Sequence, residues 1–288
     1  MESSGSDSDS GSSNSSISAG ADVPVDFQTL EAEVESNPFD ATSHTNLIKC
    51  LRNAGPSHCE QLAAAREKMA ASMALPAEMW LEWIEDDAAV VATQGDIARV
   101  EALFERAVAD TPSPDVYAAW TTFLEKNLDD EDCDAAAVAR VRAAHETAVG
   151  SMGLHVAAGG KLWDAAIAFE RRLLTNANPS VASAASEARA KITNLVKRRF
   201  SIPLEGMQAA ALALDAPLPA DVQPAYNVAL NLLAARTRHE TQVACGSPDA
   251  WAAYAAWEGA QGEPSRAHVV HERRCPPHPL QRSCRPLM

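Results

Sequence analysis

The sequence predicts an all-α protein: a right-handed α-solenoid of about six antiparallel helical hairpins with an irregular tail at each end. Three observations predict this fold. Aromatic residues spaced three apart return as a group at intervals of about 40 residues. Most of these groups precede an amphipathic segment in which a basic and an apolar residue are followed by an aromatic residue or His beside a charge. Alanine is abundant, which favours helices and their close packing. Helical pairs that repeat at this period stack into solenoids.

The segment from Trp80 to Val108 shows the repeat unit best. Trp80 and Trp83 lie three residues apart, on one face of a helix. From Ile97 onward, apolar residues occupy the i, i+3, i+4 and i+7 positions of an amphipathic helix. Gly95 lies between the two halves, where a tight turn favours a residue without a Cβ. The segment therefore predicts two antiparallel helices that need neighbouring pairs to bury their apolar faces.

Aromatic residues that recur in phase with the repeat are interpreted as the packing signature of the helical pairs. They are Trp80, Trp83, Phe104, Tyr117, Trp120, Phe123, Trp163, Phe169, Trp251, Tyr254 and Trp257. In the fourth repeat the pattern of an aromatic residue followed by apolar residues three and six places on is met by Trp163, Ala166 and Phe169. The tryptophans also suit stacking on the bases of single-stranded RNA, but their phase with the repeat favours packing between helices.

The composition divides the chain into three parts. Residues 1–22 are almost entirely Ser, Gly, Asp and Asn, which predicts a disordered tail. Residues 23–275 form the predicted solenoid, with repeats near 27–74, 77–110, 114–150, 160–202, 205–240 and 249–275. Residues 276–288 are rich in proline, so no helix is expected to continue into them.

The first repeat diverges from the others. A helix from Phe27 is expected to stop at Asn37–Pro38, and Asp40 or Thr42 suits the cap of a second helix. That helix is expected to end near Gly55–Pro56, and residues 59–73 form its partner. Its polar outer surface suits the cap of a solenoid.

The later repeats carry breaks of different kinds. In the third repeat an acidic loop at 129–134 separates the helices and lacks the turn glycine of an EF-hand. In the fourth, an Asn/Ser-rich spacer at 175–186 predicts an elongated or partly disordered loop. The fifth has lost its aromatic residues and is broken at 215–219, before a helix from Tyr226 to Ala235. The sixth begins at Asp249.

Charge, hydropathy and cysteine usage exclude several classes of protein. The net charge of −15 argues against a free-standing nucleic-acid binder, whose affinity rests on neutralising phosphates. No apolar run approaches the roughly 20 residues that span a bilayer, and the first residues lack the features of a secretory signal. The six cysteines are scattered without a C-x-x-C pair, as is typical of a reducing compartment. A soluble intracellular protein without a membrane partner is expected.

Two basic clusters are candidates for contact with a partner or RNA, although ordinary solvated helix faces are the stronger interpretation. They comprise Arg171, Arg172, Lys197, Arg198 and Arg199. Glutamates also recur once per repeat, and inter-helix ion pairs explain them better than acid–base catalysis. The recurring set is Glu105, Glu146, Glu170, Glu258 and Glu272, with Arg99, Arg106 or Arg140 as expected partners.

The sequence offers no convincing catalytic, cofactor or metal site. His268, His271 and Cys275 have the spacing of metal ligands. However, His271 occupies the position that Phe104 takes in the second repeat, so packing is favoured over zinc binding. A phosphate-binding loop and a nucleophile elbow are also missing. We therefore expect neither an enzyme nor a bound cofactor.

The two helix patterns, W-x-x-aromatic-x-x-[FW]-E and R-[VIA]-x-x-x-[FH]-E-[RT], resemble the half-a-TPR (HAT) repeat of RNA-processing proteins. More specific phrases are N-P-F-D at 37–40, L-R-N-A-G at 51–55, A-A-R-E-K-M at 64–69, E-M-W-L-E-W at 78–83, G-L-H at 153–155, L-W-D-A at 162–165 and S-I-P-L-E-G-M at 201–207. In this order they resemble the amino-terminal HAT region of the squamous cell carcinoma antigen recognised by T cells family, the spliceosomal small nuclear ribonucleoprotein recycling factors. The resemblance runs from about Leu30 to Cys275.

This resemblance implies a nuclear protein that associates with small nuclear ribonucleoprotein components as an interaction scaffold. It also implies recruitment of ubiquitin-specific proteases and dimerisation through later repeats of the array. The chain is expected to stop within the first half of that array, so dimerisation is doubtful and protease recruitment and RNA annealing are not expected of it. RNA contact is expected to be indirect or weak. A direct RNA-binding solenoid and a truncated fragment with little activity remain the alternatives.

Overall fold

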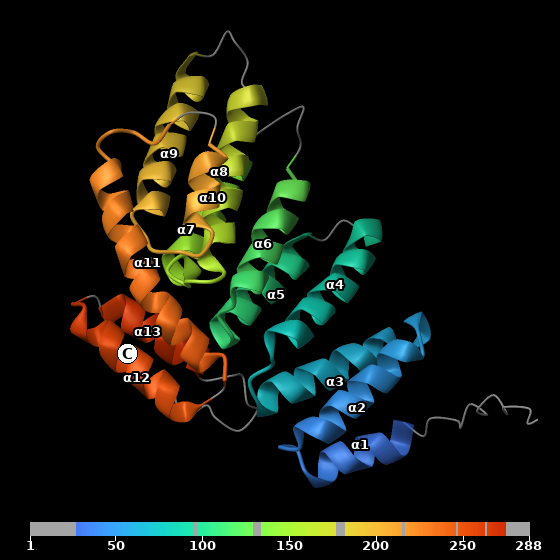
Figure 1. Cartoon of the computed structure of the whole chain (residues 1–288). Coiled ribbons are helices and arrows are strands. Elements are labelled where there is room, and N and C mark those ends of the chain that lie inside the picture. The colour runs from blue at the N-terminus through green and yellow to red at the C-terminus, as the bar shows by residue number, and fades with distance from the viewer. Residues whose placement is uncertain are drawn as a thin grey trace, which may run out of the picture. The chain divides into compact units, whose positions relative to one another are not determined.

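The computed structural model describes residues 27–94, 97–128, 134–176, 182–214, 217–245, 247–262 and 264–274, and the statements below refer to them. These residues fall into two compact units, one up to Arg66 and one from Glu67 onward. Helices are the only regular elements in this described part (Figure 1). The predicted all-α class is therefore confirmed. No helix in it is both long enough and apolar enough to cross a membrane.

The first unit contains α1 (Phe27–Ser36), α2 (Ala41–Asn53), a short 3-10 helix (Pro56–His58) and the start of α3 (Cys59–Ser72). Asp40 caps α2, because its carboxylate accepts a hydrogen bond of 3.0 Å from the backbone N–H of Thr42. Gly55 ends the segment with a φ of 87°, a left-handed conformation that favours glycine. Both features agree with the predicted cap and stop.

The second unit stacks its helices in pairs. The pairs are α4 (Ala77–Gln94) with α5 (Ile97–Asp110), α6 (Pro114–Lys126) with α7 (Ala135–Met152), α8 (Gly159–Asn176) with α9 (Ala182–Phe200), and α12 (Pro248–Ala260) with α13 (Pro264–Arg274). Successive pairs contact one another through α5 and α6, through α7 and α8, and through α11 and α12 (Figure 1). This arrangement is the predicted solenoid of helical hairpins.

The fifth pair departs from the pattern, because α10 (Met207–Leu212) is short and α11 (Gln223–Val243) is long. The sequence places the end of this second helix too early, at Ala235. Residues 236–243 contain neither Gly nor Pro, so nothing interrupts the helical hydrogen bonds there. The predicted spacer at 175–186 is also too long, since α8 reaches Asn176 and α9 begins at Ala182.

Other sequence predictions lie outside the described residues. These include both tails, at 1–22 and 276–288, and most of the acidic loop at 129–134. Asp134 is the one residue of that loop that the structure describes. Its carboxylate accepts a hydrogen bond from the N–H of Ala136 and caps α7.

The recurring aromatic residues lie at the contacts between helices. Trp80, Trp83, Phe104, Tyr117, Trp163, Phe169 and Tyr254 are buried, whereas Trp120, Phe123, Trp251 and Trp257 are half-buried. Trp163 donates a hydrogen bond of 3.0 Å from its indole N–H to the carbonyl of Gly153. A Cβ at Gly153 would lie 2.8 Å from that indole nitrogen, so the close approach requires glycine.

Candidate functional site

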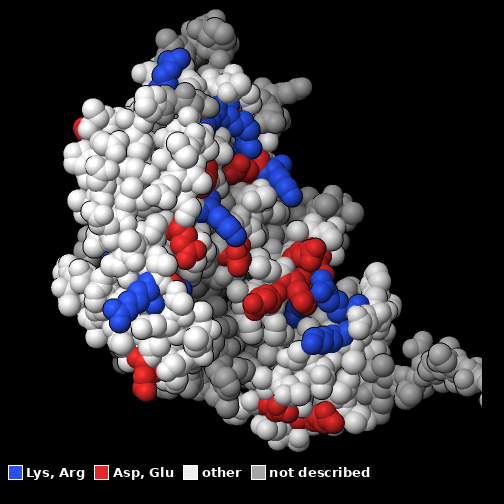
Figure 2. Space-filling model, viewed as in Figure 1, with Lys and Arg blue, Asp and Glu red and all other residues white. Residues whose placement is uncertain are grey.

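The predicted basic clusters lie on α8 and α9, and besides Arg199 three of their charges are paired with acidic side chains. The pairs are Arg172 with Glu125 at 3.1 Å, Lys197 with Asp221 at 2.6 Å and Arg198 with Glu146 at 2.9 Å. Arg171 is half-buried on α8. Figure 2 shows basic and acidic side chains lying next to one another on the viewed face of the second unit. Such pairing leaves little unneutralised positive charge for phosphates.

Arg199 does not lie on the surface where the sequence places it. Its side chain is 1% exposed, and its Nε donates to Asp164 at 3.2 Å. The guanidinium passes close to Gly160, where a Cβ would lie 2.9 Å from one of its nitrogens. Position 199 follows the buried Leu195 by about one helical turn, so both residues share the inward face of α9. The exposed basic cluster is therefore smaller than the run of basic residues at 197–199 indicates.

A motif that sequence reasoning missed holds the helical pairs together. R-A-A-H-E-T at 142–147 on α7 returns as R-T-R-H-E-T at 236–241 on α11. The fifth repeat therefore keeps the signature of its second helix although its first helix has lost the aromatic residues. A search for identical residues at the same spacing, in addition to apolar periodicity, would have found this motif.

The first residue of each motif clamps a glutamate on the next helix. Arg142 donates to both oxygens of Glu170, at 2.7 and 2.9 Å, and its third nitrogen donates to Glu187 at 2.7 Å. Hydrogen bonding to Glu170 raises the pKa of Arg142 above its usual value. Arg236 makes the equivalent two bonds to Glu258 at 2.5 and 2.6 Å. These bidentate pairs fix the second helix of one repeat to the first helix of the next.

Of the predicted glutamates, Glu146, Glu170 and Glu258 form inter-helix pairs, whereas Glu272 pairs with His268 within α13. The predicted arginine partners are wrong. Arg99 pairs with Asp87 at 2.8 Å, Arg106 with Glu67 at 2.7 Å and Arg140 with Glu101 at 3.4 Å. Arg106 shows a physical reason why its partner differs from the predicted one. Its guanidinium lies over the rings of Trp80 and Trp83, about 5.5 and 5.3 Å from their centroids, and this position brings it to α3.

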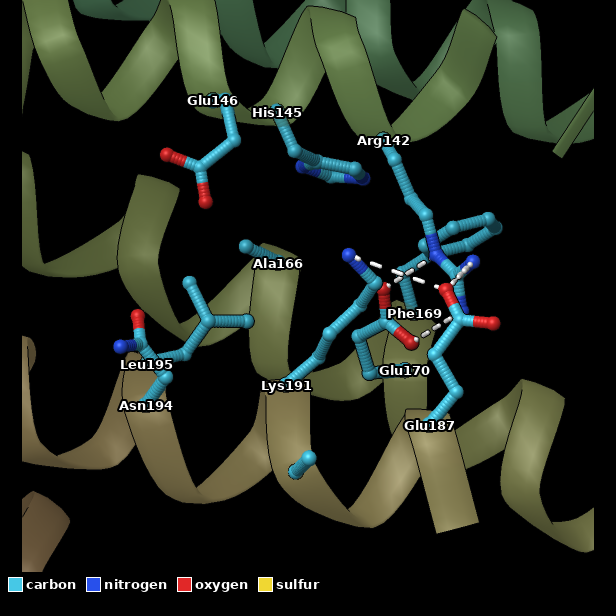
Figure 3. A pocket seen from close by; sticks show the side chains of 11 residues that line it. Arg142, His145, Glu146, Ala166, Phe169, Glu170, Glu187, Lys191, Asn194 and Leu195 are labelled. Atoms are coloured by element: carbon cyan, nitrogen blue, oxygen red, sulfur yellow. Dashed lines mark hydrogen bonds and ion pairs between the residues drawn. The ribbon is translucent and has the colours of Figure 1, made fainter. Parts of the chain in front are cut away.

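A pocket of about 380 Å³ opens between α7, α8 and α9 (Figure 3). Its apolar lining includes Ala166, Phe169 and Leu195. Its polar lining consists of Arg142, His145, Glu146, Glu170, Glu187, Lys191 and Asn194. Figure 3 shows Ala166 and His145 facing the same open space, with Lys191 reaching across from α9. The pocket thus combines a small apolar surface with charged groups of both signs.

Most charged groups of this pocket are held by other charged side chains. His145 is buried and its Nε2 lies 2.8 Å from Glu125, so a His–carboxylate pair is present. However, the residues that line the pocket include no Ser, Thr, Cys or Tyr that this pair would activate. Arg142, Glu146 and Glu170 are each held in an ion pair. Such groups orient a bound segment and distinguish its charges.

The metal-like spacing near the end of the chain forms no metal centre among the described residues. His268 lies 3.6 Å from Glu272 and His271 is exposed. Cys275, the third member of that set, lies outside the part that the structure describes.

Comparison with known proteins gives one family. Residues 28–210 match the family described as PRP39 N-terminal HAT repeat. The chain is also similar to "Spliceosome associated factor 3, U4/U6 recycling protein" of Homo sapiens and of Mus musculus, each 28% identical over 256 residues. The protein of the same description from Danio rerio is 27% identical over 263 residues.

These matches cover 86% of this chain but only 25% of the human and mouse proteins and 27% of the zebrafish protein. The chain thus spans about a quarter of the length of the curated relatives it matches.

Proposed function

Because this chain belongs to the PRP39 N-terminal HAT repeat family, we propose that it is a non-enzymatic scaffold that binds protein segments during pre-mRNA splicing. The observation that carries the proposal is the pocket between α7, α8 and α9, with its apolar surface and fixed charges. The similarity to a U4/U6 recycling protein supports components of small nuclear ribonucleoproteins as the partners. The nucleus is then the proposed location.

The mechanism rests on a binding surface that is formed before the partner arrives. Bidentate pairing of Arg142 with Glu170 holds α7 against α8, and the bond from Arg142 to Glu187 holds α9. A surface fixed in this way loses little conformational entropy when a segment binds. The stacked pairs supply the rigid support, as in other helical repeat proteins.

Contact with RNA is proposed to be indirect or weak. The net charge is −15, and Arg172, Lys197 and Arg198 each have an acidic partner. A phosphate backbone would have to break these pairs to gain the same cations. This supports a protein partner over a nucleic acid.

The proposal is tested by affinity purification from nuclear extract with the full chain as bait. We compare the wild type with Lys191→Glu, which reverses a charge in the pocket, and with Lys126→Glu, a matched reversal on the exposed end of α6. Small nuclear ribonucleoprotein proteins are expected with the wild type and with Lys126→Glu, and are expected to be lost with Lys191→Glu.

Nuclease treatment of the extract provides the second arm. Recovery that survives nuclease supports direct protein binding, whereas recovery that disappears favours the RNA-binding alternative. Equal recovery by both variants would place the binding surface outside the pocket. Recovery of chaperones alone by every bait would contradict a working scaffold.

A further inference from the structure

The pocket lies where one aromatic side chain of the repeat is missing. The middle position of the first-helix pattern holds Trp83 in the second repeat, Trp120 in the third and Tyr254 in the sixth. In the fourth repeat it holds Ala166, which lines the pocket. Protein interiors are close-packed, so a ring reduced to a methyl group leaves space that its neighbours fill only in part.

The other repeats show what occupies this space when the ring is present. Trp120 stacks on Phe104 of the preceding second helix, with centroids 6.4 Å apart and planes within 15°. Tyr254 stacks on His239 in the same way, at 5.2 Å and 5°. The counterpart of His239 in the repeated motif is His145, which lines the pocket. The ring of His145 lies near Phe169, at 5.4 Å, and faces Ala166 where a stacked ring would lie (Figure 3).

A hydrogen-bond acceptor for the hydroxyl of a tyrosine in this position is also present. The hydroxyl of Tyr254 donates a hydrogen bond of 2.9 Å to Glu240. Burial raises the pKa of Tyr254, and Glu240 raises it further, so the hydroxyl stays protonated and remains a donor. Glu240 follows His239 in the motif, and its counterpart is Glu146, which lines the pocket beside His145 (Figure 3).

We infer that the pocket binds a tyrosine side chain of a partner protein, with the ring against His145 and the hydroxyl donated to Glu146. This inference rests on the proposed protein-binding function and names the chemistry of the partner segment. Glu146 is 56% exposed and already accepts from Arg198. A carboxylate has about four lone-pair positions, so it accepts a second donor as well.

The alternatives to tyrosine satisfy the site less well. Phenylalanine would fill the space but leave Glu146 without the donor that Glu240 receives from Tyr254. The carboxylates of the pocket are already paired, Glu146 with Arg198 and both Glu170 and Glu187 with Arg142. An arginine or lysine side chain would therefore gain little from them and would approach Arg142 and Lys191, which line the same pocket. Like charges at this distance oppose binding.

The first test adds two small molecules to the full chain as probes. They are p-cresol, an analogue of the tyrosine side chain, and toluene, an analogue of the phenylalanine side chain. Binding is followed by NMR at the Ala166 methyl group. We expect saturable shifts with p-cresol, weaker binding of toluene by several-fold, and loss of p-cresol binding in Ala166→Trp. Glu146→Met should bring the two probes to equal affinity. Glu105→Met is the matched control, because Glu105 has the same place in a repeat whose site Trp120 already fills.

Three results would overturn the inference. They are equal binding of p-cresol and toluene by the wild type, p-cresol shifts that persist in Ala166→Trp, and the absence of a saturable shift up to the solubility of p-cresol. Circular dichroism checks that Ala166→Trp is folded, and Ala166→Leu provides a smaller plug if it is not. Binding of p-cresol needs no splicing component, so this experiment and the affinity purification fail independently of one another.

The second test identifies the occupant. A random peptide library is selected on the wild-type chain after removal of peptides that bind Ala166→Trp. Convergence on an invariant tyrosine is expected. Convergence on phenylalanine or on a basic residue would contradict the assignment.

Discussion

Arg236 and Glu258 form an ion pair in which both side chains are almost completely buried, with 1% and 2% of their surface exposed. Two hydrogen bonds join them, and the guanidinium also lies over the ring of Trp257. One guanidinium nitrogen, Nη1, has no hydrogen-bond partner among the residues that the structure describes. The counterpart Arg142 uses this nitrogen to bind Glu187. A pair so fully removed from water is costly to break, because the remaining charge stays buried.

Replacing Glu258 by Gln is therefore expected to lower the free energy of unfolding by about 3–5 kcal/mol. The matched control is Glu67→Gln, which breaks the pair with Arg106. Those side chains are 53% and 43% exposed, so the expected change is below about 1 kcal/mol. Urea unfolding followed by circular dichroism measures both. Equal losses in the two variants would show that burial does not set the strength of these pairs.

Trp163→Ala is expected to destabilise the protein by about 3–5 kcal/mol, since the side chain is 2% exposed and its indole donates to Gly153. Trp163→Phe should cost less, because it keeps most of the packing and loses the hydrogen bond. Val228→Ala, at a position 59% exposed, should change stability by less than about 0.5 kcal/mol. A Trp163→Ala midpoint close to that of Val228→Ala would contradict the packing role of the repeated aromatic residues.

Acid is expected to weaken the fold through His155. Burial, and next the charge of Arg273, lower the pKa of this imidazole from 6.5 to about 4. The unfolded chain then binds a proton more readily than the folded chain. The contribution is fully present above pH 6.5 and is lost as the pH falls from 6.5 toward 4, by at most about 1.4 kcal/mol per pH unit.

His155→Asn provides the comparison, because an amide oxygen can still accept from the N–H of Ala158 as the imidazole does. Urea midpoints between pH 6.5 and 4.5 should fall less steeply for this variant than for the wild type. The carboxylates titrate in both proteins, so they cancel in the difference. Parallel curves for the two proteins would rule out His155 as the source.

RNA affinity is expected to be low and to depend only weakly on salt. Binding of a single-stranded RNA oligonucleotide is measured by fluorescence anisotropy from 50 to 200 mM salt, a range in which six to ten phosphate contacts would cost about 3 × 10² to 2 × 10⁴ in affinity. Lys197→Glu with Arg198→Glu should leave the result unchanged, since both residues are already paired. A steep slope that this double variant reduces would favour direct RNA binding.

The helices were predictable because their signals are local. Asp40 caps α2 as its residue type and position indicate, and the spacing of Trp80 and Trp83 places both rings on one buried face. The partners of the long basic side chains were not predictable in this way. Arg142 reaches Glu170, 28 residues away, and no local pattern connects the two.

The sequence by itself determined the fold class, the phase of the repeat and the presence of Ala166 at the middle position of the fourth repeat. Periodicity encodes these features, because each residue of a helix has a fixed direction relative to its neighbours. The tertiary structure alone decided that Arg199 is buried and that a pocket stays open beside Ala166. Both features depend on how α7, α8 and α9 pack against one another. Long side chains from different helices form their contacts only after this packing has brought the helices together.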